Sequence, residues 1–273
     1  MNGDSEKISP KRTVLICHDT EPLNHRALAR WLASFTDLAA VVVICEPKSR
    51  LWKRVKREVK RIGLWRLLDV IAFRLYSRFF LSANDRRWTE DKLHQLEAQF
   101  PAIPRSTRIL TTQSPNSPET EQLLREVHPD LILARCKHIL NERIFGQARI
   151  GTFVMHPGIC PEYRNAHGCF WALAMRDTTN VGMTLLKIDN GVDTGPVYGF
   201  YGCNYDEIRE SHNIIQNRVV FDNLDSLRLK FDELLAEAAA PVDTKGRRSK
   251  AWGQPWLSAY LRWKRLARKQ WGA

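Results

Sequence analysis

The feature that most constrains the fold is a series of short, almost uninterrupted apolar runs separated by segments with helical spacing. The runs lie at 14–18, 38–44, 130–134 and 150–155, and an alternating run follows at 181–188. A strand that is apolar along its whole length is buried on both faces, which is typical of a parallel sheet covered by helices. The sequence therefore predicts an α/β fold with a doubly wound, mostly parallel sheet.

One domain of this kind accounts for most of the chain. Its 273 residues, 44% of them hydrophobic, can build one sizeable core with short appendages. We expect the domain over residues 13–204, with a basic helical insertion at 47–81, and a helical C-terminal extension over 205–273. A helical pattern at 211–239 predicts one long helix that covers the sheet or forms a homodimer contact.

Positive charge is concentrated in two segments. Residues 47–80 carry eleven Lys and Arg against two acids, and residues 245–273 carry nine Lys and Arg, no acid and several aromatic side chains. The net charge of the whole chain is +12, so the remainder is mildly acidic. Two interpretations of the basic tail stay open: it docks beside the insertion and forms one positive, aromatic-rich surface with it, or the two segments are independent and solvated.

The basic insertion has the pattern of an amphipathic helix, for which we favour packing on its own domain. The second interpretation is an anionic membrane surface or lipid-linked substrate, bound through 47–81 and 245–273. Nucleic acid is the least favoured partner because no recognised binding motif is present. Without a signal-peptide pattern or a run long enough to cross a bilayer, the chain is expected to be cytoplasmic, at most peripheral to the inner face of a membrane.

Ionisable residues follow two of the predicted strands. His156 ends the run at 150–155 before a Pro-Gly turn, and Asp193 stands in the turn-rich segment 189–196. Alone, either residue has an ordinary structural interpretation, as a strand-end histidine bonded to backbone or as a turn-capping aspartate. Because α/β folds place their chemistry at strand ends, we predict that the two residues meet in one active site. The six cysteines have no metal-binding spacing, and no metal site is expected.

The motifs around this pair resemble one enzyme family. The pattern H-P-G-x-x-P-x-Y-R from His156, followed by W-A, G-x-T and V-D-T-G-P, is similar to the folate-dependent formyltransferases, which include glycinamide ribonucleotide, methionyl-tRNA and amino-sugar N-formyltransferases. The resemblance is close over 151–198 and weaker over 13–204. It implies that His156 and Asp193 are catalytic and that the formyl donor is 10-formyltetrahydrofolate.

The resemblance also implies a pocket for the pterin ring and reveals one departure. The backbone of His138, Ile139, Leu140 and Asn141 is expected to line that pocket, and Thr184 matches a position where a small hydroxyl residue is usual. The family's Asn, two positions before the His, is Val154 here. Loss of one donor to the formyl oxygen costs about 10²- to 10³-fold in rate.

Two residues just beyond the motif are candidates to restore that donor. They are Asn165 and His167. For Asn165 we favour a structural role, because Asn tolerates a left-handed turn better than most side chains.

We therefore predict an N-formyltransferase that acts on an amine of a small metabolite, either anionic or lipid-associated. The alternatives are a hydrolase of 10-formyltetrahydrofolate, a non-catalytic folate-binding relative, and a protein that uses another acyl or carbamoyl donor. Initiator tRNA is not the expected acceptor, because the segment after residue 204 is short for the tRNA-binding domain of the methionyl-tRNA enzymes.

Overall fold

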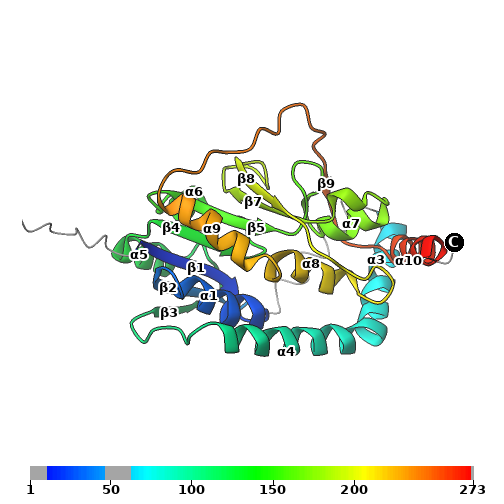
Figure 1. Cartoon of the computed structure of the whole chain (residues 1–273), viewed down its shortest axis with the longest axis horizontal. Coiled ribbons are helices and arrows are strands. Elements are labelled where there is room, and N and C mark those ends of the chain that lie inside the picture. Colours follow the sequence, from blue (N-terminus) through cyan, green and yellow to red (C-terminus); the bar gives the residue numbers. More distant parts are fainter. Residues whose placement is uncertain (1–10, 47–62, 272–273) are drawn as a thin grey trace, which may run out of the picture.

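A central seven-stranded sheet organises the computed structural model, which describes residues 11–46 and 63–271. The strand order is β3-β2-β1-β4-β5-β7-β8 (Figure 1). Five strands are parallel: β1 (Arg12–His18), β2 (Asp37–Ile44), β3 (Arg108–Thr112), β4 (Leu131–Arg135) and β5 (Gly151–His156). Next to β5, β7 (Met183–Lys187) runs antiparallel, and β8 (Val197–Tyr201) completes the sheet. The predicted doubly wound, mostly parallel fold is confirmed.

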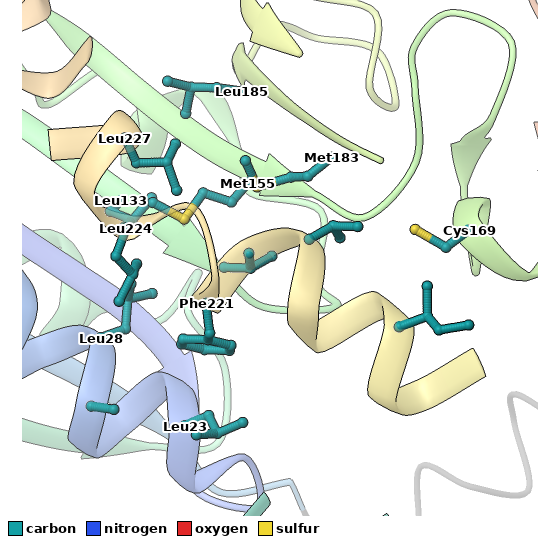
Figure 2. Close-up of a cluster of buried hydrophobic side chains, with 14 of the residues drawn as sticks. Leu23, Leu28, Leu133, Met155, Cys169, Met183, Leu185, Phe221, Leu224 and Leu227 are labelled. Atoms are coloured by element: carbon teal, nitrogen blue, oxygen red, sulfur yellow. The ribbon is translucent and has the colours of Figure 1, made fainter. Parts of the chain in front are cut away.

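Burial on both faces explains the apolar runs. In β1, Leu15 and Cys17 belong to the larger core cluster, whereas Val14 and Ile16 belong to a second cluster on the opposite face. Figure 2 shows the larger cluster, in which Leu133, Met155, Met183 and Leu185 from the strands face Phe221, Leu224 and Leu227 from two covering helices. Alternate side chains of one strand therefore serve two hydrophobic layers.

The helices that cover the sheet lie on both of its faces. They are η1 (Leu23–Leu28), α1 (Ala29–Ala33), α4 (Ser82–Gln99), α5 (Pro118–Val127), α6 (Glu142–Phe145), α7 (Gly168–Ala174), α8 (His212–Phe221) and α9 (Leu224–Leu235), with a short 3-10 turn, η3 (Thr178–Asn180), after α7. The single long helix predicted over 211–239 is wrong, because α8 and α9 are separate. Asn223 lies between them, and its side-chain N–H groups donate to the carbonyls of Val219 and Gly202, which ends the first helix.

The described part of the basic insertion and the C-terminal tail pack against each other. The insertion forms α3 (Leu64–Tyr76) and η2 (Ser77–Leu81), and the tail ends in α10 (Leu257–Trp271). Tyr260 of α10 contacts Phe73 and Tyr76 of α3, and Asp69 accepts a hydrogen bond from the Ser258 N–H at 3.0 Å (Figure 1). The predicted docking of the tail beside the insertion is confirmed, while the part of the predicted helix at 47–62 lies outside the described residues.

We call the chain between α9 and α10 the strap (residues 236–256). In Figure 1 it arches past β8 and β7 on its way to β9. The Val242 N–H donates to the Val197 carbonyl of β8 at 2.7 Å. Further along, β9 (Ala251–Trp252) pairs in parallel with β6 (Arg164–Asn165). The strap thus joins the C-terminal extension to the loop that follows β5.

Candidate active site

His156 is the last residue of β5 and is almost fully buried. Its Nε2 lies 2.8 Å from the carbonyl oxygen of Tyr163, and since a carbonyl only accepts, Nε2 carries a hydrogen. Its Nδ1 lies 3.5 Å from Oδ2 of Asp193. The predicted meeting of the two residues is therefore present: Nε2–H donates to the Tyr163 carbonyl, and Nδ1 faces the Asp193 carboxylate.

Asp193 lies in the β7–β8 loop, and several contacts hold this loop in place. Its backbone is left-handed, with φ of 51°. Its Oδ2 accepts the backbone N–H of Asn165 at 2.8 Å, and the Arg164 guanidinium donates to the Val192 carbonyl at 2.8 Å. The carboxylate of Asp189 accepts from the Gly191 N–H and the Thr194 hydroxyl, which closes the loop on itself. The carboxylate of Asp193 is thus held in place by backbone contacts.

Thr184 and two glycines shape the loop that follows His156. The Thr184 hydroxyl donates to the Gly158 carbonyl at 2.7 Å and accepts the Cys160 N–H at 2.9 Å. A Cβ on Gly158 would lie 2.5 Å from the Tyr163 carbonyl oxygen and 2.9 Å from the Cα of Gly168. The close approach of these backbones requires glycine, and the buried Thr184 holds the loop while its hydroxyl is fully engaged.

The two predicted assisting residues, Asn165 and His167, both have left-handed backbones, with φ of 76° and 56°. The side chain of Asn165 donates to the Trp252 carbonyl of the strap. The ring of His167 is buried at Nδ1, and burial lowers its pKa to about 4. Neither residue is among those that line the cleft described next, and their assistance stays a prediction.

A cleft opens beside this pair where β4 and β5 end. Its volume is about 530 Å³ when the space open to solvent is included. Asp193 forms part of its wall, together with Ala134, Cys136, His138, Ile139, Leu140, Val154, Leu186, Ile188, Asp189, Gly191 and Val192. Three of the four predicted pterin-pocket residues therefore line it. The fourth, Asn141, is not among the lining residues, and its N–H donates to the Asn116 side chain.

The cleft is apolar except at its ends. On one wall, the Ile139 side chain is 70% exposed, while the neighbouring Leu140 is buried. His138 stacks on His18 with ring centroids 5.3 Å apart, and its Nε2 lies 2.9 Å from a carboxylate oxygen of Glu46. The cleft therefore has mostly apolar walls, and the Asp189 and Asp193 carboxylates belong to its lining.

Val154 lies in this wall at the position where the family has its Asn. It is half-buried and packs with Cys160, Leu186 and Val197. Among the described side chains that line the cleft, His138 carries the one nitrogen donor, and it already contacts Glu46. The departure noted in the sequence therefore leaves an apolar surface beside the catalytic pair.

The strap contains site-supporting residues that sequence reasoning missed. Trp252 stacks on Trp171 at 4.8 Å and on Tyr163 at 5.6 Å, and its indole N–H donates to the Glu162 carbonyl. Arg247 forms a bidentate pair with the Glu162 carboxylate at 2.8 and 2.7 Å. These contacts hold the 157–165 loop. In that loop the Tyr163 carbonyl accepts from His156, and the Asn165 N–H donates to Asp193. In the sequence, the one sign of these contacts was the high tryptophan content of the tail, and this does not show which residues the tryptophans pack against.

Within residues 11–46 and 63–271, no three or more His, Cys, Asp or Glu side chains are grouped so as to hold a metal ion. In the same ranges, no helix combines the length and hydropathy that a bilayer crossing demands.

Comparison with known proteins identifies the relatives of this chain. A family model described as formyl transferase matches residues 80–227, just over half of the chain. The methionyl-tRNA formyltransferase of Chlorobium chlorochromatii is 32% identical over 82 residues, which are 30% of this chain and 26% of that protein. That of Bacteroides fragilis is 31% identical over 106 residues, 39% of this chain and 30% of that protein. The match thus spans less than a third of these curated relatives.

Solved structures share the fold. A 4-N formyltransferase from Francisella tularensis has a TM-score of 0.52 at 11% identity, covering 89% of this chain and 76% of that one. A phosphoribosylglycinamide formyltransferase from Anaplasma phagocytophilum has a TM-score of 0.53 at 14% identity, covering 90% of this chain and 100% of that one. At these identities the similarity is one of architecture.

Proposed function

Because the chain belongs to the formyl transferase family, we propose that it moves a formyl group from N10 of 10-formyltetrahydrofolate to an amine of a small metabolite. The observation that carries this proposal is the His156–Asp193 pair, whose carboxylate forms part of the wall of an apolar cleft. A buried imidazole beside a carboxylate is the arrangement that moves a proton during acyl transfer. The donor is a substrate here, and the flat cleft beside 138–140 fits its pterin ring.

The residues of the pair have separate tasks in this reaction. The amine nitrogen bonds to the formyl carbon, the carbonyl oxygen becomes an oxyanion, and the bond from carbon to N10 then breaks. Tyr163 fixes the His156 ring and leaves Nδ1 facing the Asp193 carboxylate, so a proton can pass between the two side chains. Asp193 accepts the proton lost by the amine and returns it, through His156, to the departing N10. Atoms and charge balance without a further reactant.

Two finer features of the acceptor are also proposed. An anionic or lipid-associated amine is favoured by the positive charge of α10, which carries Arg262, Lys264, Arg265, Arg268 and Lys269 and no acid. A small metabolite is the acceptor we propose. We place the protein in the cytoplasm at the inner face of a membrane, and we retain a homodimer as a prediction.

Formyl transfer is tested by incubating the full chain with 10-formyltetrahydrofolate and a panel of amines, followed by mass spectrometry of the products. We expect a formamide that requires both substrates. His156→Gln and Asp193→Asn should each lower its rate by about 10²- to 10⁴-fold while folate-induced thermal stabilisation remains.

The alternatives give different results in the same assay. Release of formate at equal rates with and without amines identifies a hydrolase. Folate binding without turnover, unchanged by His156→Gln, identifies a non-catalytic relative. Stabilisation by another acyl or carbamoyl donor, and none by folates, rejects the proposed donor.

A further inference from the structure

Several large apolar side chains are exposed on α3, η2 and α10. Helices α3 and α10 lie next to each other on the right in Figure 1. Trp65 is 84% exposed, Phe79 72%, Phe80 71% and Trp271 73%. Leu68, Ile71, Leu75 and Leu261 are exposed on the same helices. We call these side chains the α3–α10 face. Single exposed apolar residues are ordinary, but eight large ones on three adjoining elements indicate a surface that binds something.

Positive charge borders this face. A groove of about 970 Å³, with the space open to solvent included, runs between η2 and α10, and Arg209, Arg265, Arg268 and Lys269 line it beside Tyr76 and Leu81. None of the described residues that line the groove is acidic. The one acid of α3, Asp69, is bonded to the backbone and hydroxyl of Ser258. The partner must therefore accept apolar side chains and carry negative charge next to them.

A second copy of this chain does not meet that requirement. A two-fold contact brings the same patch of both subunits together, so the cations of α10 would face the cations of the other α10. Nucleic acid offers phosphates to the groove but leaves aliphatic and aromatic side chains such as Leu75, Phe79 and Phe80 in contact with charged backbone. The interface of an anionic bilayer supplies both parts, because it has a hydrocarbon boundary beneath a layer of phosphate.

We propose that the α3–α10 face docks on the surface of an anionic phospholipid bilayer. Trp65, Phe79, Phe80 and Trp271 enter the boundary between headgroups and acyl chains, and the groove cations bind lipid phosphates. The protein lies on the membrane and does not cross it. This inference stands independently of the proposed transfer reaction, since it rests on none of the residues to which that reaction is assigned.

Vesicle sedimentation with the full chain tests the proposal. We expect binding to vesicles of phosphatidylcholine mixed with phosphatidylglycerol, little binding to phosphatidylcholine alone, and weaker binding as salt rises. Phe79→Ser with Phe80→Ser should weaken vesicle binding about tenfold or more, because two aromatic rings lose their burial in the interface. Arg265→Glu with Lys269→Glu should weaken it to a similar extent.

Matched controls lie elsewhere on the surface. Leu229→Ser removes an exposed leucine of α9, and Arg105→Glu reverses an exposed cation in the loop between α4 and β3. Both should bind vesicles like the unaltered chain. Thermal unfolding of all variants shows whether each remains folded.

Several outcomes overturn the proposal. They are failure of the unaltered chain to bind anionic vesicles, equal binding to neutral ones, and unchanged binding by the Phe79/Phe80 variant. Sedimentation equilibrium provides a further test: a dimer that this variant dissociates assigns the face to a second copy. A single-stranded oligonucleotide is added as a competitor for vesicle binding. If it binds the unaltered chain and the Phe79/Phe80 variant equally well but not the Arg265/Lys269 variant, the groove is assigned to a nucleic acid.

Discussion

The backbone N–H of Asn165 donates to Oδ2 of Asp193, the same oxygen that faces Nδ1 of His156. The catalytic carboxylate is therefore positioned by a backbone group from the loop that follows β5. Asn165 can present this N–H because its φ is 76°, in the left-handed region. Its backbone conformation thus matters to the site more than its side chain does.

Asn165→Gly should accordingly retain most of the formyl transfer, since glycine adopts the left-handed conformation without strain. Asn165→Val should lose about tenfold or more in kcat, because a β-branched residue costs about 1–2 kcal/mol there and displaces the N–H from Asp193. Steady-state kinetics on both variants decide this. Equal loss in the two would show that the side-chain bond to Trp252 is what matters.

Val154→Asn should raise kcat by up to about 10²-fold, because an amide N–H would enter the cleft wall beside the catalytic pair. The unfolding free energy should fall by about 1–2 kcal/mol, since Val154 packs with Leu186 and Val197. Val154→Ala, which adds no donor, serves as the control. A rate for Val154→Asn no higher than that of Val154→Ala contradicts this prediction.

Ile139→Asp should weaken folate binding about tenfold without altering thermal stability, because the side chain is exposed in the cleft wall and supports little packing. Ile109→Asp changes an exposed isoleucine of β3 that does not line the cleft. Calorimetric titration with tetrahydrofolate compares the two. Equal affinity in both variants would place the pterin ring elsewhere.

Stability should fall as the pH drops from 6.5 toward 4. Burial lowers the pKa of His167 from 6.5 to about 4 and that of His212 well below 6.5. Between these values the unfolded chain binds more protons than the folded one, so the stabilisation is complete above 6.5 and is lost on acidification. His167→Asn, which suits the left-handed backbone, should remove about 1–2 kcal/mol of this dependence. Thermal unfolding across the range measures it, and an unchanged slope contradicts the assignment.

Trp252→Ala should reduce the unfolding free energy by about 2 kcal/mol, since this half-buried ring stacks on Trp171 and Tyr163. It should also lower kcat at temperatures where the variant is folded, because the 157–165 loop loses its support. Trp271→Ala removes an exposed indole and should change the unfolding free energy by less than about 0.5 kcal/mol. A Trp252 variant that is less stable yet fully active would separate the strap from catalysis.

The sheet and the meeting of His156 with Asp193 could be predicted because each leaves a local mark. Residues buried on both faces give continuous apolar runs, and strand ends next to turn residues mark His156 and Asp193. The break at Asn223 was not predicted, because the bonds that end α8 involve the Gly202 carbonyl from a distant loop. The contact of Trp252 with Trp171 likewise joins residues that no periodicity relates.

The orientation of the His156 ring is likewise set by a contact that the sequence pattern does not reveal. Its residue type indicated acid-base chemistry, but the acceptor on Nε2 is a backbone carbonyl, and any residue type at 163 supplies one. Tautomer and orientation thus depend on the path of the loop. The apolar surface around Val154 could be predicted from the residue type at that position. The hydrogen bond from the Asn165 side chain to the Trp252 carbonyl could not.

The strap has a consequence for biosynthesis. Strand β6 has its hydrogen-bonding neighbour in residues 251–252, which leave the ribosome long after the sheet and the residues of the active site have been made. A nascent chain that ends before Arg247 possesses every side chain of the reaction centre yet lacks the clasp that orients them. The contacts that hold the 157–165 loop are therefore among the last to form as the chain is made, because their partners Arg247 and Trp252 lie near its C-terminus.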